Sequence, residues 1–191
     1  MGNVEHGGRS ARECLLDTAS ELFYERGFQA VGVDEIVARS GVAKMTLYRH
    51  FPSKDDLIVA YLERSDAAFR AWFEGALASA DGPRDKLLAV FAALGNLAQS
   101  AGCLGCTFQV SAAEFPDPAH PAHRIALRHK RSVRSRFTKL ASDAGFRRPD
   151  VLADQLLLLM DGAWVAARMF ERQSPAAHVF DAALALMQAQ R

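Results

Sequence analysis

The sequence predicts an all-α protein in two parts, with about nine helices in total. Apolar residues recur three and four positions apart along almost the whole chain, and no stretch of useful length alternates as a β-strand does. Half of the 191 residues are hydrophobic, so the chain is able to bury a sizeable core. Glycine and proline residues divide the helical pattern into its segments.

The first expected helix runs from Ser10 to Arg26 and ends at Gly27, since glycine often terminates a helix. Its apolar face consists of Leu15, Leu16, Ala19, Leu22 and Phe23. This face predicts a helix that packs on a core rather than one surrounded by solvent.

Two short helices with a sharp break between them are expected from Val33 to Phe51. Ile36 and Val37 give the first helix an apolar side, Ser40-Gly41-Val42 supplies the break, and Leu47 of the second helix faces the core. This is the pattern of a helix-turn-helix, and its second helix, of about two turns, is stable only when packed on its neighbours. The side chains left pointing outward are Lys44, Met45, Thr46, Tyr48 and Arg49.

A long helix is expected next. Ser53 opens it with an S-x-x-D capping pattern that Asp56 completes, and no proline follows before Pro83. Such a helix spans about 26 residues, or roughly 39 Å, which is long enough to join two domains. We therefore expect a first domain at residues 1–53, with a flexible N-terminal tail, and a larger helical domain at residues 54–191.

The larger domain is expected to contain further helices at 83–100, 107–114, 120–144 and 151–171, and a last one after Ser174-Pro175. The helix at 151–171 is apolar nearly all round, so it is expected to be buried on more than one side. Together with the broad apolar stripe of the last helix, it would leave a large exposed patch on a monomer. We therefore expect these two helices to pair with their copies in a homodimer.

The charge is distributed unevenly. The formal net charge is only +1, but no acidic residue occurs from Ile36 to Lys54, where Arg39, Lys44 and Arg49 also lie. This basic segment suits contact with phosphate groups. Seven Lys or Arg residues without an acid also occur between positions 118 and 142, and they form either a solvated helix face or a second nucleic-acid surface.

Three cysteines are an odd number in a chain of this length, which does not indicate a secreted disulfide framework. The N-terminal residues lack the apolar stretch of a signal peptide, and the longest aliphatic run, at 156–160, falls far short of the roughly 20 residues that span a bilayer. We expect a soluble, cytoplasmic protein without a membrane partner.

Residues 12–57 resemble the tetracycline-repressor-like (TetR/AcrR) transcriptional regulators. The residues that carry the resemblance are Leu15-Leu16, Ala19, Leu22-Phe23, Gly27-Phe28, Val33, Ile36, Gly41-Val42, Thr46-Leu47-Tyr48, His50-Phe51, Ser53-Lys54 and Leu57. The resemblance implies a ligand-responsive regulator, most simply a repressor, that binds a near-palindromic operator as a homodimer. It also implies an unidentified small effector in the C-terminal domain, no enzymatic activity and no cofactor.

The resemblance also assigns roles by position. Lys44, Met45, Thr46 and Arg49 are expected to reach base edges, and Tyr48, His50 and Lys54 to hold phosphates. The ring of Tyr48 either does this or packs on the first helix, and Lys54 either does this or is a solvated lysine. The family often has Ser or Thr at the start of the second helix. Here Val31-Gly32-Val33 stands there, which puts the cap and one phosphate contact in doubt.

Aromatic and polar residues of the second domain are candidates for an effector pocket. The candidate set is Trp72, Phe91, Phe108, Gln109, Glu114, Asp161 and Trp164. Asp161 interrupts the most apolar helix and needs a partner if it is buried, and Arg168 is one candidate on the same face.

Cys103 and Cys106, followed by His120 and His123, have a spacing that resembles a tetrahedral zinc set. The alternatives are a redox-active thiol pair and two structural thiols, so metal or thiol-redox sensing is an alternative to an organic effector. A dithiol oxidoreductase is a further alternative, but the βαβ context expected around such a motif is missing.

Overall fold

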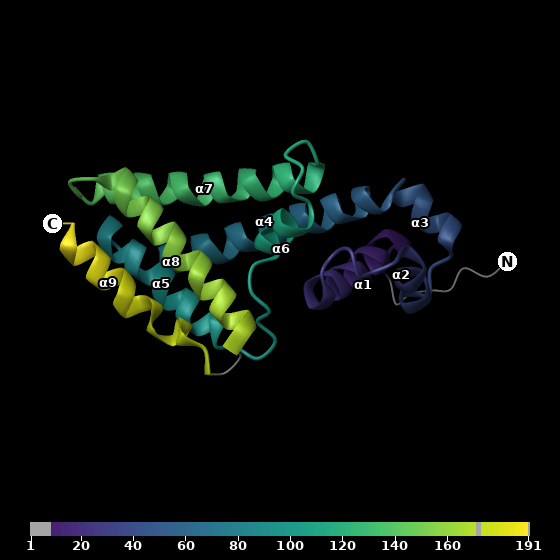
Figure 1. Cartoon of the computed structure of the whole chain (residues 1–191), viewed down its shortest axis with the longest axis horizontal. Helices are drawn as coiled ribbons and strands as arrows, with labels where there is room; N and C mark the ends of the chain where they lie inside the picture. Colours follow the sequence, from purple (N-terminus) through teal and green to yellow (C-terminus); the bar gives the residue numbers. More distant parts are fainter. Residues whose placement is uncertain (1–8, 171–172, 191) are drawn as a thin grey trace. The chain divides into compact units, whose positions relative to one another are not determined.

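The computed structural model describes residues 9–170 and 173–190, and this part of the chain contains nine α-helices and no strand (Figure 1). The predicted all-α class is therefore confirmed. The helices are α1 (Ala11–Arg26), α2 (Val33–Ser40), α3 (Lys44–His50), α4 (Lys54–Ala78), α5 (Pro83–Ala98), α6 (Thr107–Glu114), α7 (Pro121–Asp143), α8 (Pro149–Phe170) and α9 (Val179–Ala189). The predicted N-terminal tail and the predicted end of the 151–171 helix at Glu171 lie outside the described residues.

Serine side chains cap the starts of α1 and α4. Ser10 caps α1 in a capping box, in which its hydroxyl accepts from Glu13 N and the Glu13 carboxylate accepts from Ser10 N. The hydrogen bond from the Ser10 side chain is the main reason that the pKa of Glu13 is lowered. At α4, Ser53 Oγ accepts from Asp56 N at 3.1 Å, which confirms the predicted cap.

The last helix begins later than predicted. Ser174 Oγ accepts from Ala176 N at 3.2 Å, and the residues that follow form a 3-10 helix, η2 (Pro175–His178), before α9 starts at Val179. Pro175 suits the first position of this turn because its ring fixes φ, and its missing N–H is not needed there.

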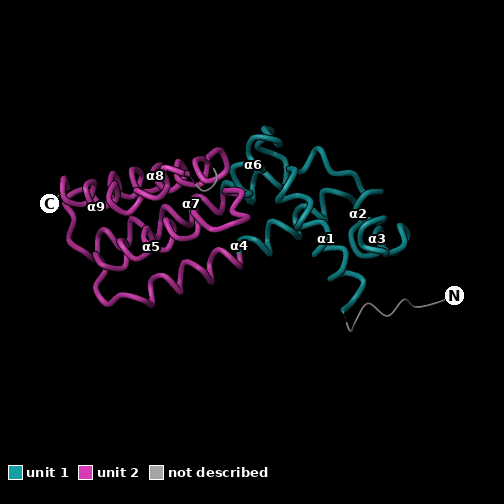
Figure 2. The backbone as a smooth tube through the Cα atoms, turned by 90° about the horizontal axis from the view of Figure 1, so that it is seen from below, with its two compact units in different colours: residues 1–66, 107–127 teal, residues 67–106, 128–191 magenta. Residues whose placement is uncertain are grey.

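Two compact units make up the chain (Figure 2). Unit 1 contains the residues up to Asp66 together with Thr107–Leu127, and unit 2 contains Ala67–Cys106 and the residues from Arg128 onward. The boundaries fall inside α4 and α7, so the expected division at residues 53 and 54 does not coincide with the compact units. The first turns of α4 belong to unit 1 because they pack on its aromatic core.

The aromatic core of unit 1 contains residues from both chain segments of that unit, the one up to Asp66 and the one at Thr107–Leu127. The rings of Phe23 and Phe28 lie 5.4 Å apart, and the ring of Tyr61 from α4 lies 5.8 and 5.9 Å from them. Phe115, which follows α6, lies 5.6 Å from Phe28. Segments far apart in the sequence thus share one core.

In unit 2, α5, α8 and α9 lie side by side (Figure 1). Phe91 and Phe137 stack with their ring centres 5.7 Å apart, and Phe73 lies 5.8 Å from Phe137; all three side chains are fully buried. The described residues include no helix that is both long enough and apolar enough to cross a membrane.

Candidate functional site

Helix α3, the second helix of the helix-turn-helix, is held by buried residues on one side only. Leu47 is fully buried, as is Ile36 of α2, and Val42 in the turn is nearly so. Gly41 ends α2 in the left-handed conformation, with a φ of 69°, and its N–H donates to Val37 O. The predicted break is therefore a tight turn that sets the direction in which α3 leaves α2.

The other side of α3 is open to solvent. Met45 is 83% exposed and Tyr48 is 42% exposed, and Lys44 and Arg49 are also exposed, while Thr46 is half-buried. Seven residues cannot form a stable helix alone, so α3 depends on Leu47 for its position. Its geometry is that of a short helix that presents side chains.

Lys44 forms an ion pair that the sequence did not indicate. Its ammonium lies 2.6 Å from Asp34 of α2, and hydrogen bonding to Asp34 raises the pKa of Lys44. Both side chains are more than half exposed, so the pair is weak and easily exchanged for a phosphate or a base. Among the described residues no salt bridge engages Arg49, which leaves its guanidinium available.

Lys54 and His50 are half-buried. Burial lowers the pKa of Lys54, and the nearby charges of Asp55 and Glu114 act in the opposite direction. Lys54 is therefore neither fully solvated nor distant from acids, and any phosphate it holds competes with these carboxylates. Its expected phosphate role stays a prediction.

The N-terminus of α2 lacks a side-chain cap. Its N-cap residue is Gly32, and no side chain bonds to the first turn. The expected lack of a cap at this point is confirmed, whereas the doubtful phosphate contact stays untested. The four N–H groups of the first turn are thus partly left to solvent or to a ligand.

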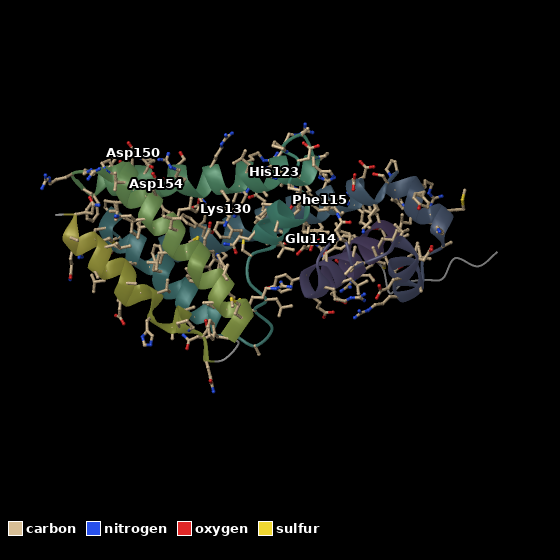
Figure 3. All side chains as sticks on the ribbon, in the orientation of Figure 1. Glu114, Phe115, His123, Lys130, Asp150 and Asp154 are labelled. Atoms are coloured by element: carbon tan, nitrogen blue, oxygen red, sulfur yellow. The ribbon has the colours of Figure 1, made fainter. Side chains whose placement is uncertain are left out.

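Glu114 lies in unit 1, at the end of α6, rather than among the candidate pocket residues of unit 2 (Figure 3). Its Oε2 accepts hydrogen bonds from the backbone N–H groups of Phe28, at 2.9 Å, and Gln29, at 2.7 Å. Phe108 and Gln109 also belong to unit 1. The candidate effector set is therefore divided between the units, and Glu114 is engaged within unit 1, which also contains the helix-turn-helix.

The four residues with zinc-like spacing do not gather as ligands. Cys103 and Cys106 belong to unit 2 and His120 and His123 to unit 1, and no group of three or more His, Cys, Asp or Glu in the described ranges has a metal-binding arrangement. His120 Nδ1 accepts from Ala122 N, and His123 Nδ1 lies 2.8 Å from Phe115 O. Both histidines thus form hydrogen bonds with backbone atoms in and next to the connection between α6 and α7.

Trp72 and Trp164 meet in unit 2, with their ring centres 6.2 Å apart in an edge-to-face arrangement. They are the two tryptophans of the chain. Phe91, by contrast, is fully buried and stacked on Phe137, so it belongs to the core.

Asp161 pairs with Lys130 of α7, and Arg168 instead donates to Leu104 O at 3.0 Å. Lys130 Nζ also lies 3.6 Å from Cys106 Sγ. Sequence reasoning missed Lys130 because it stands in a basic run. The available signal was its register, since Lys130 follows Ala126 by four residues and precedes Val133 by three on the buried side of α7.

The family described as bacterial regulatory proteins, tetR family, has a sequence model that matches residues 15–61 of this chain. These residues include α2, α3 and most of α1. A TetR-family transcriptional regulator from Streptomyces coelicolor has 35% sequence identity and a TM-score of 0.90, and the match covers 94% of this chain and 95% of that one. The chain belongs to the TetR family of transcriptional regulators.

Other TetR-family proteins match over different lengths. A putative TetR regulator from Streptomyces avermitilis is 33% identical, with a TM-score of 0.81, over 95% of this chain and 98% of that one. The transcriptional repressor NemR of Escherichia coli is 34% identical over 115 residues, or 59% of this chain and 58% of NemR. The activator FasR of Mycolicibacterium smegmatis is 46% identical over 67 residues, or 33% of this chain and 31% of FasR.

These matches to NemR and FasR span less than two thirds of either protein. The family and the fold are those of transcription regulators rather than enzymes. Because one of the two relatives is named a repressor and the other an activator, the sign of regulation does not follow from family membership.

This TetR-family chain exposes an apolar stripe on α8. Leu158 is 72% exposed, Val165 45% and Met169 70%, and Gly162 lies between them on the same face. Beside the stripe, residues of α8, η2 and α9 line a groove of about 300 Å³. α8 packs against α5 and α9 and also meets Trp72 of α4 and Lys130 of α7, as expected for a helix buried on more than one side. Its remaining face carries the exposed apolar patch that the sequence predicts for a monomer, and nothing in the described part of the chain covers it.

Proposed function

We propose that the protein is a ligand-responsive transcriptional repressor that binds a near-palindromic operator as a homodimer, with α3 of each protomer in the major groove. The observation that carries the proposal is α3 itself, a helix anchored by buried Leu47 and exposing Lys44, Met45 and Arg49. A helix of this kind fits the width of the major groove. Repression is the sign named for NemR, the relative matched over the longer stretch.

Base readout is assigned to Lys44, Met45, Thr46 and Arg49, and phosphate contact to Tyr48, His50 and Lys54. Arg49 is the strongest candidate for specificity, because an exposed guanidinium is able to pair bidentately with a guanine. Lys44 contributes after its ion pair with Asp34 opens, which makes its contribution sensitive to salt.

The homodimer is assigned to α8 and α9. The exposed stripe of Leu158, Val165 and Met169 is supported by Gly162, where a partner helix is able to approach the backbone closely. An apolar stripe of this length, next to a groove, is typical of a self-complementary interface around a two-fold axis.

The effector is assigned to the cluster of Trp72, Trp164, Lys130 and Asp161 in unit 2. The two indole rings offer apolar surface, and the half-buried ion pair offers a polar anchor. The long helix α4 runs through both units, so a shift of it on effector binding would change the distance between the two α3 helices. Half-sites lie about 34–36 Å apart, so a mismatch of a few Å weakens simultaneous docking.

Thiol sensing at Cys106 is a second candidate for the signal. Lys130 Nζ lies 3.6 Å from Cys106 Sγ, and Cys103 lines a separate hollow of about 210 Å³. All three cysteines are free thiols. Modification of Cys106 would disturb the Lys130–Asp161 pair, which is the same pair that anchors an organic effector.

Selection of duplexes from a random DNA pool by the purified chain tests the DNA-binding proposal. Enrichment of a near-palindromic sequence supports it, and the absence of any enriched sequence contradicts it. Intrinsic fluorescence then serves to screen effectors, because both tryptophans lie in the proposed cluster. A candidate compound must change this fluorescence and also release the selected duplex.

A further inference from the structure

The turn between α1 and α2 is held by a carboxylate from far along the chain. Glu114 Oε2 accepts from the N–H of Phe28 at 2.9 Å and from the N–H of Gln29 at 2.7 Å, across 86 and 85 positions of sequence. The fully buried ring of Phe28 also packs on Phe115, the residue that follows Glu114. These contacts all lie within unit 1; Glu114 and Phe115 are labelled in Figure 3.

Helix electrostatics does not explain a negative charge at this point. Glu114 is the last residue of α6 and lies beside the end of α1, and the C-terminal ends of both helices disfavour an anion. Two hydrogen bonds to an ionised acceptor offset this, because charge-assisted bonds are stronger than neutral ones. The charge is therefore tied to the two backbone N–H groups.

Gly27 leaves the space that the carboxylate needs. Its φ is 81°, which glycine adopts readily, and a Cβ added there would lie 2.2 Å from Glu114 Oε1. A side chain at position 27 would thus displace the carboxylate from the turn.

Besides Glu114, the turn is held by the buried side chains of Phe28 and Val31 and by a hydrogen bond from Arg26 to Ala30 O at 3.3 Å, and none of these contacts bonds the N–H groups of Phe28 and Gln29. The N-cap of α2 is Gly32, which makes no side-chain hydrogen bond, and the nearby Arg26–Glu35 pair is exposed on both sides. Exposed pairs contribute little and are screened by salt. The turn determines where α2 begins, and α2 leads through Gly41 directly into α3.

The segment that carries Glu114 is itself anchored in unit 1. The hydroxyl of Ser111, a fully buried residue, donates to Ala122 O at 3.2 Å, and His123 Nδ1 lies 2.8 Å from Phe115 O. The end of α6 therefore presents Glu114 from a fixed position rather than from a loose loop.

We propose that Glu114 is a positioning residue for DNA recognition, whose carboxylate fixes the α1–α2 turn and, through α2, the placement of α3. The inference rests on the proposed function, because operator binding is its readout. If Glu114 has this role, residues 107–127 contribute to DNA recognition although they lie outside the helix-turn-helix.

Variants Glu114→Ala, Glu114→Gln and Asp117→Asn test the proposal in the full chain. Asp117 is the matched control: it lies in the same segment, and its replacement changes the charge by the same amount as Glu114→Gln. Its Oδ1 accepts only from Ala119 N, a bond that asparagine also makes. The probe is the duplex enriched from the random pool by the wild-type chain.

We expect Glu114→Ala to bind this duplex about 10- to 100-fold more weakly, the loss that corresponds to one or two hydrogen bonds to a charged acceptor. The dependence of binding on salt concentration should stay the same, because no phosphate contact is removed. Hydrogen exchange of the Phe28 and Gln29 amides should accelerate. Glu114→Gln, which keeps one acceptor oxygen, should fall between Glu114→Ala and the wild type, and Asp117→Asn should bind without loss.

If Glu114→Ala binds DNA with wild-type affinity although the Phe28 and Gln29 amides exchange faster, the turn does not affect recognition and the proposal is overturned. If the exchange of the two amides does not change, Glu114 does not hold the turn, and the proposal is overturned as well. If Glu114→Gln and Asp117→Asn weaken DNA binding equally, the loss is explained by net charge alone, and the proposal is overturned. If Glu114→Ala does not fold, the comparison of Glu114→Gln with Asp117→Asn decides. If the wild type enriches no duplex, the proposed function fails, whereas the exchange measurement still reports whether Glu114 holds the turn.

Discussion

Replacement of Leu158 by glutamine tests whether α8 forms the dimer interface. Leu158 is 72% exposed in the single chain, so nearly three quarters of its burial remains available to a partner. Complete burial of a leucine side chain stabilises by about 1.5–3 kcal/mol, and the available share is therefore about 1–2 kcal/mol per protomer. Because a two-fold axis brings both copies into the interface, the expected loss is about 2–4 kcal/mol, or about 30- to 700-fold in the dimer Kd.

Sedimentation velocity over a range of concentrations measures this shift. Glutamine is a good helix former, so the fold of the protomer should be retained and far-ultraviolet circular dichroism should not change. Leu97→Gln is the control, since Leu97 is an exposed apolar residue, at 37%, in the same unit but on a different helix, α5. A dimer Kd unchanged in Leu158→Gln, or weakened equally in Leu97→Gln, refutes the assignment of the interface to this face.

Three further predictions concern unit 1. Arg49→Ala should lower affinity for the selected duplex by about 1–3 kcal/mol and relax the sequence preference of the protein. Lys54→Ala should instead weaken binding to specific and random duplexes alike, and it should reduce the slope of log affinity against log salt concentration by about one. Competition binding at several salt concentrations separates the two effects. Gly27→Ala should destabilise the fold by about 1–3 kcal/mol in urea unfolding, because its φ is 81° and the new methyl group meets a carboxylate at 2.2 Å; an unchanged midpoint would contradict this. Ser10→Ala should lower the melting temperature. The pKa of Glu13 is lowered from its ordinary value of 4.5, so its hydrogen bonds stabilise the fold above that pH and are lost as the pH falls through the lower folded pKa. The difference from the wild type should therefore shrink below pH 4.5, and a difference that grows there would refute the link.

Helix ends were predictable where one or two local residues determine them. The short helix expected at 107–114 has these bounds in the structure, and the Ser53 cap and the Gly41 break also occur as expected. The last helix was predicted less well, because whether the residues after Ser174 start as an α-helix or a 3-10 helix depends on a single hydrogen bond in the first turn.

The candidate sites were predictable to different degrees. Met45 and Arg49 are exposed as the spacing around Leu47 requires, since three- and four-residue spacing alone separates the two sides of a helix. Glu114 and Asp161 were both candidates for the effector pocket, and the sequence did not reveal the partner of either one. Each partner lies at least 30 positions away, on another element.

The sequence by itself determined the all-α class, the helix-turn-helix and the outward face of α3, because these follow from interactions within a few residues. Tertiary structure decided which distant groups meet: Glu114 with the turn after α1, and Lys130 with Asp161. The physical reason is that a carboxylate or an apolar stripe indicates only that a partner is needed. Many donors and surfaces satisfy that need equally well until the fold brings one of them within bonding distance.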